Sequence, residues 1–318
     1  MTKLLILLTL PEKVRTQYYN GIKARFPDIE VNIVDHHSKG DPYMAEADIL
    51  VTFGPMMAEH VLEKAAKPKW IQALGSGVDG ITDRPALRGD IVVTNLHGIH
   101  GPPVSEAALM AMLALSRGLS RTMRNQQQHQ WERSVPPSLL KGKTVVIFGV
   151  GVISSELAPK CKALGMRVIG VSSTARKVPG FDHVYARGEL EQTAREADYL
   201  VLLTPYSEAT RGSVGANIFA AMKPTSYLVN LARGGVVDED AMITALRQGR
   251  IAGAALDVFS QEPLPESHPL WAMDNVIITP HQGGFYDEYV TEALPVIEHN
   301  LHRFLAGDMA GMINLVKH

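Results

Sequence analysis

Short apolar runs alternate with helix-like patterns along almost the whole chain, and this alternation restricts the fold more than any other feature. Uninterrupted apolar runs such as residues 49–53 and 144–148 are typical of strands that are buried on both faces. When such strands alternate with helices, successive strands are parallel and the fold is of the α/β class. We predict strands at residues 4–9, 31–34, 49–53, 70–74, 91–94, 144–148, 167–171, 199–203, 227–231, 252–256 and 276–279.

The strands fall into two series, and the 318 residues allow two domains with separate cores. A long helical pattern over residues 104–129, apolar in its body and polar from Arg121, separates the series, with its start marked by Pro102 and Pro103. Shorter helical patterns lie at residues 13–26, 57–66 and 286–305. We predict two Rossmann- or flavodoxin-like parallel-sheet domains, formed by residues 1–97 with 286–318 and by residues 98–285.

Composition excludes several classes of protein. The chain has 31 Lys and Arg against 33 Asp and Glu, so that its net charge is −2 and nothing suggests nonspecific nucleic-acid binding. Cys161 is the single cysteine, which rules out a disulfide within the chain and favours the cytoplasm. The apolar segment 4–10 ends at Pro11 without a small-residue cleavage site, so we expect a first strand and not a signal peptide. No run is long enough for a membrane span.

A glycine turn follows the first strand of the second series. Gly149 and Gly151 stand between that strand and the start of a predicted helix, with Ser154 at the third position of a GxGxxG-like pattern. The first glycine permits a tight turn, the second lets the backbone approach a pyrophosphate, and the third position needs only a small side chain. The helix start stabilises the phosphate charge. We therefore predict a dinucleotide site; an ordinary strand–helix turn is the alternative.

The end of the next strand indicates which dinucleotide binds. Sites for NAD usually carry an Asp or Glu there, on the ribose 2′-hydroxyl. This chain has Ser172 and Ser173 instead, followed by Arg176 and Lys177. Hydroxyls and cations suit a 2′-phosphate, so we predict NADP(H) in preference to NAD(H). In the alternative interpretation, the two cations belong to a solvated loop.

Three segments near the C-terminal end supply Arg233, Glu262 and His281, each shortly after an apolar run. The planar fork of an arginine suits a carboxylate. An acid beside a histidine suits proton transfer near neutral pH. Together with a hydride carrier, the three indicate reduction of a 2-keto acid. Singly, the same residues could be a loop ion pair, a turn cap and a core histidine.

With these segments in this order, the chain resembles the D-isomer-specific 2-hydroxyacid dehydrogenases, which include the glyoxylate/hydroxypyruvate reductases. The resemblance covers nearly the whole chain. It rests on the glycine turn and on the segments Gly75-Ser76-Gly77-Val78-Asp79, Leu203-Thr204-Pro205 with Thr210, Asn230-Leu231-Ala232-Arg233-Gly234, Asp257-Val258-Phe259 with Glu262-Pro263-Leu264, and Thr279-Pro280-His281 with Gly283-Gly284.

The resemblance implies a role for each site residue. His281 would give a proton to the keto oxygen, Glu262 would hydrogen-bond the other imidazole nitrogen, and Arg233 would bind the substrate carboxylate. The backbone amides of Ser76 and Gly77 would hold that carboxylate from the first domain. The active site is then expected in the cleft between the domains.

The resemblance also implies a homodimer, in which Trp131 lies at or near the interface. Related formate dehydrogenases pair their histidine with Gln, so Glu262 argues against formate. Besides Gly149, Gly151, Ser172, Ser173 and Arg176, the expected cofactor contacts are Val104, Val152, Ile153, Thr204, Pro205, Thr210, Leu231, Ala232, Asp257 and Gly283.

Other functions remain open on the sequence alone. The same Arg, Glu and His would serve an enzyme for phosphite or a bulkier keto acid, and the fold also occurs in nucleotide-sensing corepressors. No metal site is expected, because His36 and His37 lack a supporting cluster of Cys or carboxylates. The substrate side chain is expected to meet residues 53–57, Leu74, 97–100 and 285–286.

Overall fold

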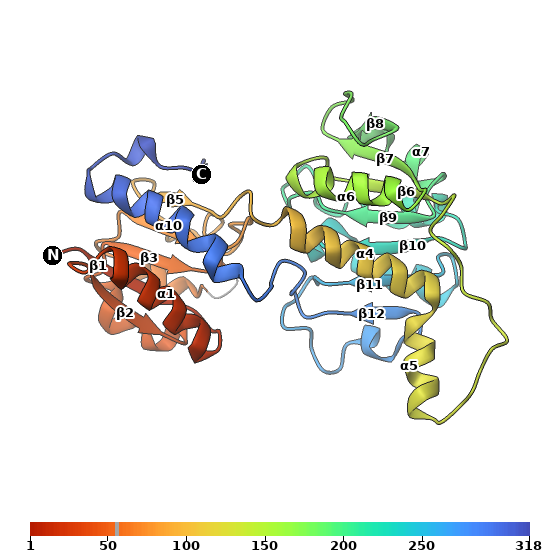
Figure 1. The fold of residues 1–318 in the computed structure, drawn as a ribbon, viewed down its shortest axis with the longest axis horizontal. Helices are drawn as coiled ribbons and strands as arrows, with labels where there is room; N and C mark the ends of the chain where they lie inside the picture. The colour runs from red at the N-terminus through yellow and green to blue at the C-terminus, as the bar shows by residue number, and fades with distance from the viewer. Residues whose placement is uncertain (55–56) are drawn as a thin grey trace. The chain divides into compact units, whose positions relative to one another are not determined.

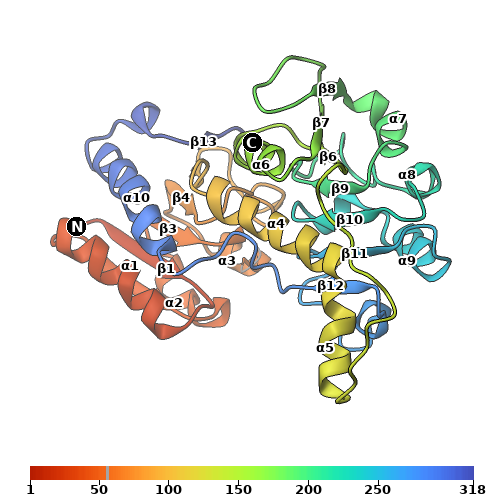
Figure 2. The ribbon, with the colours of Figure 1, turned by 45° about the vertical axis from the view of Figure 1, so that its right-hand side comes forward.

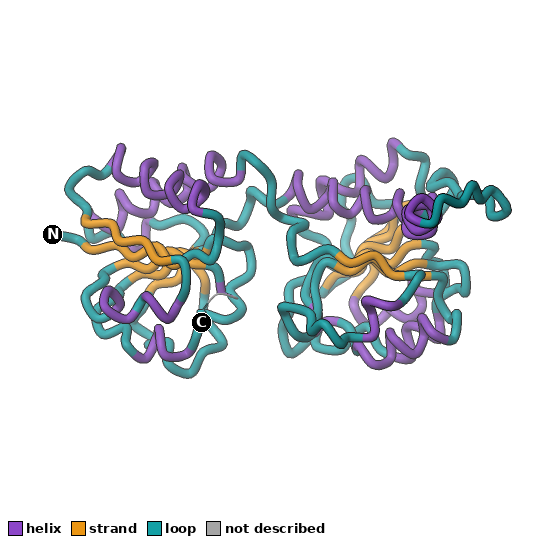
Figure 3. The backbone as a smooth tube through the Cα atoms, turned by 90° about the horizontal axis from the view of Figure 1, so that it is seen from below, coloured by secondary structure: helices purple, strands orange, loops and turns teal. Residues whose placement is uncertain are grey.

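The structure is a computed structural model that describes residues 1–54 and 57–318. It divides the chain into two compact units, Met1–His100 with Tyr286–His318 and Gly101–Phe285. In the sequence-based division the first boundary follows residue 97. Residues 55–56, within the range expected to meet the substrate, lie outside the described residues. In each unit, helices cover both faces of one sheet (Figure 3).

The sheet of the first unit has the strand order β13-β5-β4-β3-β1-β2. All neighbouring strands are parallel except β13 and β5, which pair antiparallel. Parallel pairing places the carboxyl ends of β1 to β5 at one edge, where ligands of α/β proteins bind. The strands are β1 (Lys3–Leu7), β2 (Glu30–Val34), β3 (Ile49–Thr52), β4 (Trp70–Ala73), β5 (Val92–Thr94) and β13 (Leu315–Val316).

Two apolar layers cover this sheet, because alternate residues of a strand point to opposite faces. Leu4 and Ile6 pack under α1 (Glu12–Arg25) and α10 (Tyr289–Leu305), which lie side by side (Figure 1). Leu5 and Leu7 pack on the other face, with α2 (Asp41–Met44) and α3 (Glu59–Glu63). The last helix of the chain therefore belongs to the core of the first unit.

The sheet of the second unit is entirely parallel, in the order β12-β11-β10-β9-β6-β7-β8. From β6 the sheet extends through β7 and β8 in one direction, and from β9 it extends through β10, β11 and β12 in the other. The boundary between β6 and β9 is therefore the switch point where doubly wound folds bind dinucleotides. The strands are β6 (Thr144–Phe148), β7 (Arg167–Ser172), β8 (His183–Ala186), β9 (Tyr199–Leu202), β10 (Tyr227–Asn230), β11 (Gly253–Leu256) and β12 (Val276–Ile278).

Helices cover both faces of the second sheet. On one face, α4 (Gly101–Arg117) and α6 (Val152–Ala163) run side by side (Figure 2) and form one core cluster with the strands. On the other face, the cluster includes residues of α7 (Leu190–Ala194), α8 (Ala216–Ala221) and α9 (Glu239–Arg247). With both faces buried, these strands carry the near-continuous apolar runs seen in the sequence.

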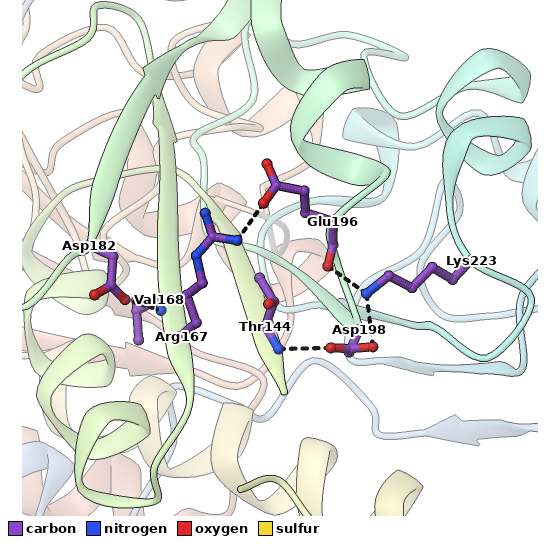
Figure 4. A network of polar contacts seen from close by, with 7 residues as sticks. All are labelled: Thr144, Arg167, Val168, Asp182, Glu196, Asp198 and Lys223. Atoms are coloured by element: carbon purple, nitrogen blue, oxygen red, sulfur yellow. Dashed lines mark hydrogen bonds and ion pairs between the residues drawn. The ribbon is translucent and has the colours of Figure 1, made fainter. Parts of the chain in front are cut away.

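Polar contacts hold the amino ends of the central strands (Figure 4). The Asp198 carboxylate accepts a hydrogen bond from Thr144 N at 2.8 Å and forms an ion pair with Lys223 Nζ at 3.1 Å. Asp182 accepts one from Val168 N at 2.7 Å, and Arg167 pairs with Glu196. The network ties together the amino ends of β6 and β7 and the segments that lead into β9 and β10.

The predicted helix over residues 104–129 is wrong as a single element. The structure has α4, which ends at Arg117, and a separate α5 (Leu119–Gln127). Gly118 between them has φ 64° and ψ 38°, in the left-handed region. A left-handed residue ends a helix, and glycine adopts this conformation without the penalty that a Cβ brings. The helix-like pattern that continues on both sides of Gly118 concealed the break.

The remaining differences concern short elements. β8 and β13 were not predicted, and the helix predicted over residues 57–66 is only Glu59–Glu63. Both strands lie at sheet edges, where fewer apolar residues are needed, so that the sequence signal is weak. Among the described residues, no helix combines the length and apolarity that crossing a membrane requires.

Candidate functional site

The predicted catalytic residues all lie in the second unit, just past the carboxyl ends of its parallel strands. Arg233 follows β10, Glu262 lies in the segment after β11, and His281 follows β12. The expected cofactor residues lie past neighbouring strands at the same edge or at the start of the helices that follow. Ser76 and Gly77 occupy the corresponding position in the first unit, after β4.

The glycine turn has the geometry that a tight strand–helix connection requires. Gly149 has φ 111°, and a Cβ there would lie 2.5 Å from Leu203 C and closer still to Thr204 N. Gly149 and Thr204 therefore touch at the switch point between β6 and β9. Gly151 has extended angles, φ −148° and ψ −156°, and no atom within 4 Å of an added Cβ. Only the first glycine is required by the fold itself.

Ser154 takes the third position of the pattern and closes the start of α6. Its Oγ accepts from Gly151 N at 2.8 Å and donates to Gly151 O at 2.9 Å, and the side chain is buried. The serine thus fits the packing that a third glycine would otherwise allow. The first turn of α6 remains directed at the glycine turn, which suits an anionic pyrophosphate.

The segment after β7 places a cation beside the glycine turn. Arg176 donates to Ser172 Oγ at 2.6 Å and to the carbonyl oxygen of Val150 at 2.8 Å. Ser172 is half-buried, whereas Ser173 and Arg176 are exposed. The guanidinium is therefore held between the end of β7 and the turn, where the ribose of a bound dinucleotide is expected. No carboxylate stands at the end of β7.

His281 and Glu262 form a hydrogen-bonded pair. His281 Nδ1 lies 2.6 Å from Glu262 Oε2, with about a third of the imidazole and a quarter of the carboxylate exposed. Glu262 Oε1 accepts from Phe259 N at 3.0 Å. Burial opposes ionisation of Glu262, but the hydrogen bond and charge of His281, the Phe259 amide and the Arg233 charge outweigh it and lower the pKa of Glu262. An ionised partner on Nδ1 leaves Nε2 of His281 for proton transfer.

The backbone of His281 is held in an uncommon conformation by Asp257. His281 has φ 50°, in the left-handed region, and its N–H donates to Asp257 O at 2.8 Å. The buried Asp257 carboxylate accepts from Gln282 N at 2.9 Å, Gly283 N at 2.8 Å and Thr279 Oγ1 at 2.5 Å. Strained residues persist where surrounding contacts over-determine them, and often at functional sites. Asp257 fixes the segment that carries the imidazole.

Arg233 is placed by a similar local anchor. Asn230, the last residue of β10, accepts from Ala232 N at 3.1 Å and donates to Arg233 O at 3.2 Å through its buried side-chain amide. Arg233 itself donates to Ala232 O at 2.7 Å. Its charge acts on Glu262. The arginine, the glutamate and the histidine thus form one electrostatic group within the second unit.

The other expected cofactor residues are arranged along the same edge. Thr210 is buried and ties the segment after β9 by donating to Pro205 O at 2.8 Å and accepting from Ser207 N at 2.8 Å. Val152 is the most exposed apolar residue at the start of α6. Buried positions are held by Val104, Thr204, Ala232 and Asp257, while Ile153, Pro205, Leu231 and Gly283 are half-buried or exposed.

In the first unit, Ser76 and Gly77 lie in a half-buried turn after β4. Asn95 Nδ2 donates to Ser76 O at 2.7 Å, and Leu96 N donates to Gly75 O at 3.0 Å. His100 Nδ1 lies 2.8 Å from Ser76 Oγ. The segment 95–100 therefore fixes the turn whose amides are expected to bind a carboxylate.

Sequence reasoning missed several residues that build the site. Asn230 was read only as part of a motif, and Asn95 and Tyr289, which contacts His100, were not singled out. An Asn at the end of an apolar strand could have marked the first two, since such amides cap turns. Nothing local marks Tyr289, which lies far from its partner in the sequence.

Two expectations about other chemistry can be compared with the structure. Cys161 is buried within α6, and burial raises the pKa of its thiol to about 12, as fits a structural residue. In the described part of the chain, no group of three or more His, Cys, Asp or Glu is arranged to hold a metal ion.

Residues 109–283, more than half of the chain, match the family described as "D-isomer specific 2-hydroxyacid dehydrogenase, NAD binding domain". A glyoxylate reductase of Korarchaeum cryptofilum is 32% identical over 275 residues, which cover 83% of this chain and 81% of that protein. D-3-phosphoglycerate dehydrogenases of Methanocaldococcus jannaschii and a Synechocystis strain are 34% identical. The chain spans about half the length of these two relatives.

Solved structures share the fold over the whole chain. A D-isomer specific 2-hydroxyacid dehydrogenase family protein of Aeromonas salmonicida is 34% identical with a TM-score of 0.87, over 99% of both chains. An NADPH-dependent glyoxylate/hydroxypyruvate reductase of Sinorhizobium meliloti, solved with NADP and sulfate, is 26% identical with a TM-score of 0.83. That similarity covers all of this chain and 98% of the other.

Proposed function

Because the chain belongs to the D-isomer specific 2-hydroxyacid dehydrogenase family, we propose that it transfers a hydride between NADP(H) and a small 2-keto acid such as glyoxylate or hydroxypyruvate. The observation that carries the proposal is the His281–Glu262 pair at 2.6 Å, with Arg233 acting on the same carboxylate. The product of reduction is the corresponding 2-hydroxy acid, of D configuration where its C2 is a stereocentre.

His281 acts as the general acid in this reaction. Its Nδ1 is committed to Glu262, so Nε2 holds the proton that passes to the keto oxygen. A bound dinucleotide would supply the hydride that reaches the keto carbon. Glu262 fixes the orientation of the imidazole and stabilises its charged form, which exists before the proton is given. In the oxidation direction, the neutral imidazole accepts the hydroxyl proton.

Arg233 and the amides of Ser76 and Gly77 hold the substrate's carboxylate. An arginine fork makes two parallel hydrogen bonds to a carboxylate and also polarises the adjacent carbonyl. Backbone N–H groups add donors without the flexibility of a side chain. Every acid of the proposed class carries this carboxylate next to the reacting carbonyl. These residues therefore account for the shared part of the substrates, and the side-chain part is left to other contacts.

The preference for NADP(H) rests on the segment after β7. Ser172 Oγ and Val150 O hold Arg176 beside the glycine turn. In this position its positive charge can pair with a 2′-phosphate. A carboxylate at the position of Ser172 would repel that phosphate and favour the 2′-hydroxyl of NAD. The Sinorhizobium meliloti reductase, whose structure contains NADP, supports the same choice.

Initial rates test both parts of the proposal. NADPH oxidation is followed with glyoxylate, hydroxypyruvate, pyruvate, phenylpyruvate and 3-phosphohydroxypyruvate, and each rate is repeated with NADH. We expect turnover of glyoxylate and hydroxypyruvate and a kcat/KM at least several-fold higher with NADPH. A tenfold preference for NADH would contradict the cofactor assignment. A preference for the phosphorylated or aromatic acid would contradict the substrate assignment, and turnover of phosphite alone would replace it.

We also propose that a second copy of the chain is the macromolecular partner. Large apolar side chains are exposed along α4, α5 and the segment that follows, with Trp131 90% and Leu139 62% exposed. Exposed apolar clusters of this kind are typical of protein interfaces. Light scattering that gives the mass of one chain at micromolar concentration would contradict the homodimer. The other exposed large apolar side chains of these segments are Met110, Leu113, Leu119, Met123 and Val135.

A further inference from the structure

A chain of hydrogen bonds runs from the turn after β4 into the core of the first unit. Ser76 Oγ lies 2.8 Å from His100 Nδ1, and His100 Nε2 lies 3.0 Å from the hydroxyl of Tyr289. That hydroxyl donates to the carbonyl oxygen of Leu74. These contacts join three segments that are distant in the sequence. They are the turn after β4, His100 at the end of the range Met1–His100, and Tyr289 at the start of α10.

With His100 as a neutral imidazole, the direction of every hydrogen bond follows from the last one. A carbonyl oxygen can only accept, so Tyr289 gives its single hydroxyl proton to Leu74. The Tyr289 oxygen must then accept from His100, which places a proton on Nε2. In the neutral imidazole Nδ1 is an acceptor, and it receives the hydroxyl proton of Ser76. The chain of contacts fixes one tautomer of His100 and one orientation of the Ser76 hydroxyl.

These groups are buried, so the arrangement has consequences. His100 is 9% and Tyr289 5% exposed. Buried polar groups that lose a partner are costly, and a fully satisfied network is rigid. Asn95 binds the carbonyl oxygen of Ser76 at the same time. The side chain and the carbonyl of Ser76 are both held from within the first unit, so the conformation of the residue whose backbone N–H is proposed to bind the substrate is fixed.

We propose that His100 is a positioning residue for the substrate's carboxylate, acting through Ser76. This inference rests on the proposed function, because it takes the Ser76 and Gly77 amides as carboxylate donors. With its hydroxyl proton committed to His100 Nδ1, Ser76 presents one fixed backbone conformation to the substrate. Without that acceptor the hydroxyl rotates freely, and Ser76 loses one of the two side-chain contacts that hold it.

The proposal predicts an effect on binding and not on chemistry. The proton donor His281 and its partner Glu262 belong to the second unit, whereas every member of this network belongs to the first. Loss of the His100 contact should therefore raise KM for the keto acid and leave kcat nearly unchanged. A defect in folding would instead reduce the amount of active enzyme, and with it the apparent kcat.

Two conservative variants separate the two nitrogens of His100. The amide oxygen of Asn can replace Nδ1 as the acceptor for Ser76, whereas Gln reaches the position of Nε2 and loses the Ser76 contact. We expect His100→Gln to raise KM for glyoxylate about fivefold, the size of one net hydrogen bond. His100→Asn should stay within about twofold of the wild type. The inhibition constant of oxamate, a carboxylate that cannot be reduced, should change in parallel.

A double variant tests whether the effect passes through Ser76. If it does, His100→Gln adds nothing to Ser76→Ala, because the hydroxyl that it frees is already gone. Multiplying effects in the double variant would overturn the proposal. Equal KM values for the Asn and Gln variants would also overturn it, since they would indicate packing alone.

Controls separate this inference from the function on which it rests. Asn300→Ala removes buried hydrogen bonds to Gln72 and Ile313 in the same unit, and it should lower Tm without changing KM. A wild type that reduces no keto acid would refute the proposed function. Nitrogen-15 NMR of His100 then still decides the geometry: a proton on Nε2 supports the network, and a proton on Nδ1 overturns it.

Discussion

At the scale of single residues, the site depends on how each reactive side chain is anchored. Asp257 holds the His281 segment through three acceptor contacts, and Asn230 holds the turn that carries Arg233. These anchors are buried and polar, so they add precision to groups that remain half-exposed and reactive. Catalytic groups need such support, because small displacements cost large factors in rate.

Glu262 gives a prediction about stability and pH. Its pKa is lowered in the folded protein, so its ionisation stabilises the fold above the unfolded pKa near 4.5, and this contribution is lost as the pH falls through the folded value. Glu262→Gln retains the shape but cannot ionise. The difference in unfolding free energy between wild type and variant should be largest at pH 6 to 7 and should shrink below about pH 4.5.

Denaturant titrations at several pH values measure this difference. Every carboxylate other than Glu262 is present in both proteins, so the difference between wild type and variant isolates the ionisation of Glu262. A difference that stays constant from pH 7 down to pH 3 would mean that Glu262 is not selectively ionised in the fold.

The residue types of the site could be predicted from the sequence, but their anchors could not. Arg233, Glu262 and His281 follow apolar strands in recognisable segments, so their grouping at one sheet edge follows from parallel topology. The contact between His100 and Tyr289 joins residues that are remote in sequence and have no local pattern. Only packing of α10 on the first sheet brings them together.

At the scale of secondary-structure elements, the turn between β6 and α6 separates what the fold needs from what the cofactor needs. Gly149→Ala forces a left-handed backbone on alanine and drives its Cβ into Leu203 and Thr204, so we expect a clear loss of Tm. Gly151→Ala meets no protein atom and has extended angles, so Tm should change little. Its Cβ would instead obstruct the approach of a pyrophosphate, and the Kd for NADPH should rise at least tenfold.

Thermal melts and NADPH fluorescence titrations measure the two effects separately. The glycine pair is internally matched, because both variants add one methyl group to the same turn. Tight NADPH binding by a stable Gly151→Ala protein would place the dinucleotide elsewhere.

Most elements could be predicted because buried parallel strands leave continuous apolar runs. The predicted strand at residues 144–148 coincides with β6, and the others differ from the structure by one or two residues at an end. The errors have physical causes. Gly118 breaks a helix-like pattern that continues on both sides, and the edge strands β8 and β13 are short and partly exposed.

At the scale of the whole molecule, the proposed reaction assigns different tasks to the two units. The second unit carries the dinucleotide turn, the proton donor and the arginine, and the first carries the amides of Ser76 and Gly77. Each unit has its own sheet and its own core clusters. A substitution in one unit should therefore change the binding or catalytic step assigned to that unit and leave the fold of the other unit intact.

The kcat/KM of His281→Ala with glyoxylate and NADPH, relative to wild type, tests the central claim most directly. The second unit offers a matched control in His268, which also pairs with a carboxylate, Glu239, at 3.3 Å. We predict a loss of at least about 100-fold for His281→Ala, from the usual size of general acid catalysis. His268→Ala should remain within a few-fold of wild type, and both variants should keep their Kd for NADPH. A His281→Ala protein with wild-type kcat/KM would contradict the account.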